Sequence, residues 1–197
     1  LIEVLEGGWP WLLLWPFGIY LAWSQLNTRW GSWSLFTQIV LGISILPLKM
    51  QLPWYSHVLW LPFSLLCGPP MAWLIKRNGF NFIPGAKLLT WIPFIWSAIG
   101  AVLISLVFTG FFGITPWILP YIKIILPISI GWFFGGLFLT NDFEKSRQIG
   151  FLIVVLGSVM GLFFLMGSNF WLWELNENWD VRPVSKILAD THNKEVY

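Results

Sequence analysis

Long apolar runs alternate with short polar turns along this chain, and the runs are nearly free of charged residues. Each run approaches the roughly 20 apolar residues that an α-helix needs to cross a bilayer. Because backbone groups in lipid must be hydrogen-bonded within their own segment, runs of this kind favour helices. The pattern predicts an all-α polytopic membrane protein with six spans, at residues 9–26, 33–48, 53–75, 88–110, 117–140 and 149–167.

Prolines are expected to change the shape of the first and third predicted spans. Pro16 is expected to bend the first span, while Pro62 and the Gly-Pro-Pro run at residues 68–70 are expected to break the third. A proline inside a helix removes a backbone hydrogen bond, and such a break is tolerated in a membrane only where protein or water covers it. The third span is therefore predicted to be interrupted and covered.

The composition leads to the same class of protein. Of the 197 residues, 57% are hydrophobic and 10% are charged, whereas about 25% are charged in an ordinary soluble domain. The chain has 16 Trp residues, and Trp favours the membrane interface. A net charge of +2 is too small to indicate a nucleic-acid partner. The single cysteine, Cys67, excludes an internal disulfide, and we interpret it as a small buried apolar residue.

The basic residues predict the orientation of the chain in the membrane. Cytoplasmic loops carry an excess of Lys and Arg. The second and fourth loops contain a single basic residue, Lys49. Lys123, in the fifth span, is expected to lie near the outer interface, where its amine can reach water. The first, third and fifth loops contain Arg29, Lys76, Arg77, Lys87, Lys145 and Arg147. These three loops are thus predicted to be cytoplasmic and both chain ends extracytoplasmic, in a bacterial inner membrane or a plasma membrane.

The character of the sequence changes in residues 168–197, where aromatic residues alternate with acids and amides. The tryptophans at 171, 173 and 179 are typical of a belt at the outer surface. Glu174 and Glu177 are three residues apart, but we interpret them as part of a solvated linker rather than as a catalytic pair. This region is predicted to be an interfacial segment and the start of an extracytoplasmic domain. The chain is expected to be a piece of a longer protein.

One segment, residues 46–62, places several polar side chains among apolar residues. It contains Lys49, Gln51, Tyr55 and His57 between three prolines. Ionisable groups in or near a membrane are costly, so they indicate a functional site. The orientation above predicts that this segment faces outward.

Lys49 and Tyr55 are the leading candidates within this segment. An ammonium group supplies a point charge and a phenol supplies a directional donor, and both suit a phosphate. The alternative is that Lys49 only extends to the interface and that Trp54 and Tyr55 only anchor the chain there. His57 has no Cys, Asp or Glu at ligand spacing, so no metal site is predicted. A divalent cation would have no visible ligands here.

The residues of this segment resemble a known family. The run Lys-Met-Gln-Leu-Pro-Trp-Tyr at 49–55, followed by an apolar span with Pro62, is similar to the lysine–leucine–proline–x–tyrosine segment of lipid-linked sugar transferases. These are related to protein O-mannosyltransferases and to the aminoarabinose transferase of lipid A. The tail also resembles their passage into an outer domain, with Trp-Glu-Leu at 173–175, Pro-Val at 183–184 and the close at 195–197.

This resemblance implies a function at the outer face of the membrane. The donor would be a polyprenyl- or dolichyl-phosphate sugar, and an inverting displacement would move the sugar to a lipid or glycan acceptor. Tyr55, and then Lys49, would contact the donor phosphate, and Gln51 and His57 would line the cavity. The catalytic carboxylate would lie in the N-terminal half of the protein, so no catalytic residue is expected in this chain. Members of the family often carry proline where this chain has Val58, so the segment departs from the family's pattern at this position.

Two alternatives belong to other classes. The first is a non-catalytic membrane subunit of a larger assembly, whose helices approach closely at small residues; the glycines that support it are Gly131, Gly135, Gly136, Gly157 and Gly161. The second is a fragment of a transporter, for which the broken third span and Lys123 are the indications.

Overall fold

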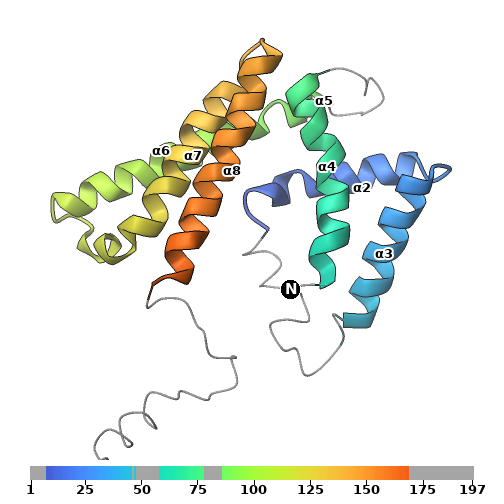
Figure 1. Ribbon diagram of the computed structural model, residues 1–197, viewed down its shortest axis with the longest axis horizontal. Helices are drawn as coiled ribbons and strands as arrows, with labels where there is room; N and C mark the ends of the chain where they lie inside the picture. Colours follow the sequence, from blue (N-terminus) through green and yellow to red (C-terminus); the bar gives the residue numbers. More distant parts are fainter. Residues whose placement is uncertain (1–7, 46, 48–57, 78–85, 169–197) are drawn as a thin grey trace, which may run out of the picture.

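The computed structural model describes residues 8–45, 47, 58–77 and 86–168 of the chain (Figure 1). All regular elements in these ranges are helices, which agrees with the all-α membrane class. They are η1 (Trp11–Leu13), α2 (Trp15–Ser24), α3 (Arg29–Ile45), α4 (Trp60–Lys76), α5 (Ala86–Leu89), α6 (Ile92–Phe111), η3 (Pro116–Tyr121), α7 (Ile122–Leu139) and α8 (Glu144–Met166).

Three helical segments in the described ranges are long and apolar enough to cross a membrane. They are Lys87–Phe111, Pro116–Leu139 and Glu144–Met166, and they correspond to the fourth, fifth and sixth predicted spans. The helices in the first three predicted spans are shorter, with 10 residues in α2 and 17 each in α3 and α4. The membrane class is therefore supported, while the number of six spans stays a prediction.

The first predicted span does not form one helix. A short 3-10 turn, η1, precedes α2, and Pro16 lies in the first turn of α2 rather than at a bend inside it. Proline is favoured at this position because the first N–H groups of a helix have no partner within the helix. Pro16 therefore helps to begin a helix, and α2 then lies across α4 in Figure 1.

The expected break in the third span is wrong, because α4 continues as an α-helix through Pro69 and Pro70. These prolines remove the usual donors to the carbonyls of the residues four positions earlier, Leu65 and Leu66. The Leu65 carbonyl accepts a bond from Trp30 Nε1 of α3 at 3.3 Å. The Leu66 carbonyl lies against the backbone of Gly18, where a Cβ atom would clash with it. Two neighbouring helices, α2 and α3, thus cover the carbonyls that the prolines leave without a donor. Because α4 is continuous, the broken third span no longer supports the hypothesis of a transporter fragment.

Helices α6, α7 and α8 form a bundle in which backbones meet at glycines. A Cβ atom on Gly131 of α7 would lie 2.8 Å from the Cα atom of Gly157 of α8. On the other side of α7, a Cβ atom on Gly136 would lie 2.5 Å from the carbonyl oxygen of Pro93 in α6. The surfaces of these glycines are therefore covered by other helices of the same chain. The glycines no longer favour the hypothesis of a subunit that packs against other proteins.

Aromatic residues join the first helices to this bundle. The ring of Trp11 in η1 makes edge contacts with Trp96 of α6 and Phe151 of α8, with centroids 5.7 and 6.1 Å apart. Trp96 is fully buried, and its Nε1 donates to the carbonyl of Pro10 at 3.1 Å. The core therefore lies where η1 enters between α4 and the bundle.

Candidate functional site

The four site residues predicted from the sequence, Lys49, Gln51, Tyr55 and His57, lie outside the described residues. Their roles stay predictions. The helix that follows them is described, and α4 begins at Trp60, three positions after His57. The part of the candidate site that the structure describes therefore consists of α4 and the side chains that pack against it.

A groove runs along one face of α4 and has a volume of about 360 Å³. From α4 it is lined by Trp60, Phe63, Ser64, Cys67, Gly68 and Met71, and from the other elements by Trp11, Leu14 and Phe151. The α4 residues recur at helical spacing over 11 positions, which is about 16 Å at 1.5 Å per residue. The groove therefore follows the helix axis, and it begins at the end of α4 that adjoins the predicted site segment.

The walls of the groove are apolar. Ser64 Oγ donates to the carbonyl of Trp60 in its own helix at 2.6 Å. The thiol of Cys67, which is buried as predicted, lies 3.6 Å from the carbonyl of Trp11. Both polar side chains of the lining thus already have backbone partners. A groove with these walls can accept a hydrocarbon chain but offers little to a polar ligand.

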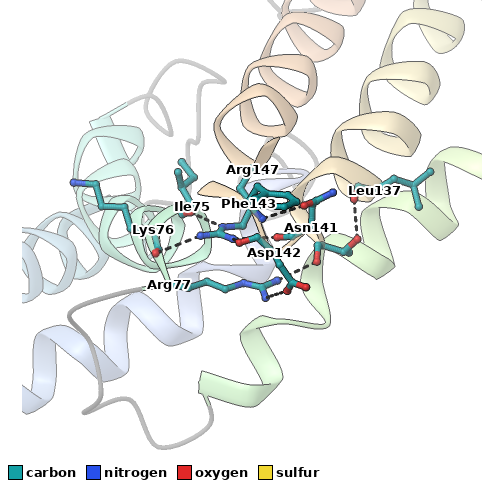
Figure 2. A network of polar contacts seen from close by, with 9 residues as sticks. Ile75, Lys76, Arg77, Leu137, Asn141, Asp142, Phe143 and Arg147 are labelled. Carbon is teal, nitrogen blue, oxygen red and sulfur yellow. Dashed lines mark hydrogen bonds and ion pairs between the residues drawn. The ribbon is translucent and has the colours of Figure 1, made fainter. Parts of the chain in front are cut away.

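The opposite end of α4 is held by a buried arginine (Figure 2). Arg147 of α8 is only 4% exposed. Its Nε donates to the carbonyl of Ile75 at 2.5 Å, and its Nη2 to that of Lys76 at 3.4 Å. Its Nη1 donates to the carbonyls of Asn141 at 3.0 Å and Asp142 at 2.5 Å. One side chain therefore joins the last turn of α4 to the connection between α7 and α8.

A second arginine lies beside the first. Arg77 follows α4 with a φ of 52°, in the left-handed region, and its N–H bonds back to the carbonyl of Trp73 at 2.7 Å. Its Nη2 donates to the carbonyl of Thr140 at 3.4 Å. Its Nη1 lies 3.7 Å from the carboxylate of Asp142, whose side chain is 98% exposed. The Nε of Arg77 is buried without a hydrogen-bond partner. Only part of this guanidinium is therefore satisfied.

The role of Arg147 was missed in the sequence. Residues 141–148 were interpreted as a charged loop, but α8 already begins at Glu144. One signal was present. Arg147 shares a helix face with the buried residues Gly150, Val154 and Gly157, at spacings of three, seven and ten. A charge in register with a glycine stripe indicates a packed position rather than a solvated one.

The structure assigns no binding or catalytic contact to the other candidate residues from the sequence. Lys123 is exposed on the first turn of α7, and Glu174 and Glu177 lie outside the described residues. Among the residues that the structure describes, no group of three His, Cys, Asp or Glu side chains comes together to bind a metal. Comparison with protein-family profiles, with curated proteins and with solved structures finds no match for this chain.

Proposed function

We propose that this chain is the C-terminal membrane part of an inverting glycosyltransferase that uses a polyprenyl-phosphate sugar at the outer face of a membrane. The observation that carries the proposal is the apolar groove on α4. It begins beside the segment that contains the lysine–leucine–proline–x–tyrosine-like motif. A lipid-linked donor needs this combination, a polar site for the phosphate next to an apolar path for the chain.

The orientation of α4 supports the outer location. Its 17 residues extend about 26 Å, close to the roughly 30 Å hydrocarbon core of a bilayer. The end at Lys76 and Arg77 is basic, as cytoplasmic ends are. The other end, at Trp60, would then approach the outer surface. The six-span topology, with both ends of the chain outside, is part of this proposal, and α3 and α4 serve in it as short spans.

Within this proposal the donor has two contacts. Tyr55 and Lys49 bind its phosphate, with Gln51 and His57 in the cavity wall. The first isoprene units of the donor lie in the groove, against side chains such as Phe63 and Met71. The carboxylate that assists the lipid or glycan acceptor comes from the N-terminal part of the protein.

The test of the phosphate site uses the protein encoded by the complete open reading frame. Tyr55→Phe and Lys49→Ala each remove one contact to the phosphate, which is worth about 1.5 kcal/mol for a charged partner. We expect the KM for a synthetic polyprenyl-phosphate sugar to rise about tenfold in each variant. Unchanged KM and turnover in both variants would refute the site.

A matched pair of variants tests the groove. Ser64→Phe fills the groove, and because Ser64 is exposed and bonds only to its own helix, the helix is retained. Leu61→Phe adds a ring one turn away, at a side chain that is 69% exposed and not part of the lining. Binding of undecaprenyl phosphate should weaken at least fivefold in Ser64→Phe and stay within twofold in Leu61→Phe. Equal binding by both variants would remove the groove from the proposal.

A further inference from the structure

The arginine pair at the end of α4 carries an excess of positive charge that the described contacts do not neutralise. All the hydrogen bonds of the Arg147 side chain go to neutral backbone carbonyls. Burying a cation without a countercharge is costly. The carboxylates of Glu144 and Asp142 both act on Arg147 from a distance, and both residues are exposed. Asp142 forms its ion pair with Arg77 instead, at the long distance of 3.7 Å. The two guanidinium groups are therefore balanced only by exposed carboxylates, and neither carboxylate hydrogen-bonds to Arg147 among the described contacts.

Arg77 is the member of the pair that an anion can reach. Its side chain is 31% exposed. Its bond to the carbonyl of Thr140, at 3.4 Å, is long for an N–H···O bond. Guanidinium groups bind phosphate oxygens through two parallel N–H donors. Figure 2 shows Arg77 lying beside Asp142, with Arg147 on the other side of that residue. The terminal nitrogens of Arg77 each have one long contact, to Asp142 and to Thr140, so an anion can bind them in competition with these contacts, and the charge of Arg147 adds attraction.

An apolar side chain next to this charge indicates the kind of anion. Phe143 follows Asp142 directly, and its side chain is 75% exposed. The carbonyl of Phe143 accepts the backbone N–H of Arg147 at 3.2 Å, so the backbone of Phe143 is fixed beside the arginine pair. A free phosphate would gain nothing from an exposed phenyl ring. A lipid presents both a phosphate and an acyl chain. In the orientation proposed above, this end of α4 faces the cytoplasmic leaflet, which is rich in anionic lipids.

We propose that Arg77, supported by Arg147 and flanked by Phe143, binds the phosphate of an anionic phospholipid. The site lies at the end of α4 opposite to the proposed donor segment, and it does not depend on transferase activity. Its ligand holds together the same two parts of the molecule that Arg147 joins, because Arg77 ends α4 while Asp142 and Phe143 connect α7 to α8.

The experiment measures lipid binding to the purified full chain in detergent by native mass spectrometry. Phosphatidylglycerol is the probe, and phosphatidylcholine and inorganic phosphate are the comparisons. Arg77→Gln should lower the affinity for phosphatidylglycerol about tenfold. Arg77→Lys, which keeps the charge but loses the fork, should lower it about threefold, and Phe143→Ser should lower it by a similar factor. Lys145→Gln removes an exposed charge from the same end of α8 and should change the affinity less than twofold.

Three outcomes would overturn the proposal. In the first, Arg77→Gln and Arg77→Lys both retain the full affinity. In the second, Lys145→Gln loses as much affinity as Arg77→Gln, which would indicate unspecific attraction. In the third, millimolar inorganic phosphate displaces phosphatidylglycerol, which would assign the site to free phosphate. Circular dichroism of each variant verifies that the helices are retained, and Arg77→Lys keeps the test valid if Arg77→Gln does not fold.

Discussion

The two halves of the described structure differ in how far their helices pack through direct backbone contacts. In the bundle of α6, α7 and α8, backbones touch directly, because glycines such as Gly131 and Gly157 face each other. In the part formed by η1, α2, α3 and α4, a backbone contact of this kind joins Gly18 of α2 to the Leu66 carbonyl of α4. Aromatic rings such as those of Trp15 and Phe63 fill other space between these helices, which are also shorter. The groove lies in this second part and touches the bundle only through Phe151 of α8.

This difference explains where a ligand can bind. Glycine contacts leave no room between two helices, so the bundle is suited to hold a shape. Aromatic and proline contacts are made at separated points, and between them a groove of about 360 Å³ remains. We infer that the bundle acts as the support and that the first four helices carry most of the groove proposed for the lipid-linked donor.

The largest expected effect on stability comes from a substitution at a glycine contact between α7 and α8. Gly157→Leu places a Cβ atom 2.6 Å from the Cα atom of Gly131, where the backbone cannot yield. We expect the free energy of unfolding, measured by SDS titration in mixed micelles, to fall by about 3 kcal/mol. Gly167→Leu is the matched control, since a Cβ atom there meets nothing closer than 3.6 Å. Similar stabilities of the two variants would contradict tight glycine packing.

A smaller effect is expected at the joint between the two parts. Arg147→Met removes the donors to four carbonyls but also removes a costly buried charge. The balance should lower the free energy of unfolding by about 2 kcal/mol, since each unpaired polar group in the interior is expensive. Lys145→Met, two residues away and exposed, should change it by less than about 0.5 kcal/mol. If the two variants were equally stable, Arg147 would not hold the parts together.

The smallest effect is expected within the first part. Trp30→Phe keeps an aromatic side chain, although a smaller one, but loses the donor to the Leu65 carbonyl, at a cost of about 1 kcal/mol. Pro69→Ala restores an N–H group to that carbonyl within the helix. In the double variant the cost of Trp30→Phe should therefore largely vanish. A thermodynamic cycle with no coupling between the two positions would show that Trp30 does not compensate for Pro69.

The sequence predicted the part of the fold that depends on long apolar runs. The segments Lys87–Phe111 and Pro116–Leu139 lie within one residue of their predicted bounds. The segment Glu144–Met166 begins five residues earlier than expected, because an acid is stabilising in the first turn of a helix, and the charged residues there are part of α8. Hydrophobicity alone thus locates a helix in lipid but not its polar ends.

The errors came from contacts between distant residues. Whether the two prolines break α4 depends on Trp30, which lies 39 positions before Pro69, and on Gly18. No local pattern contains that information. Arg147 was misjudged because its charge suggested water, whereas its partners lie up to 72 positions away. The candidate site at Lys49 and Tyr55 lies outside the described residues and rests on the motif, the basic-residue pattern and the groove whose first α4 residue, Trp60, follows Tyr55 by five positions.

The order of the helices along the chain has a consequence for the α4 carbonyls that Pro69 and Pro70 leave without a donor. Both of their partners, Gly18 and Trp30, precede α4 in the chain, so the ribosome releases them before Pro69 and Pro70. In the proposed six-span topology, the two helices that cover the exposed backbone of α4 are therefore made before α4 is inserted. A permuted gene that encodes α4 before α2 and α3 would, in that topology, expose those carbonyls to lipid during insertion, and we expect it to yield less inserted protein.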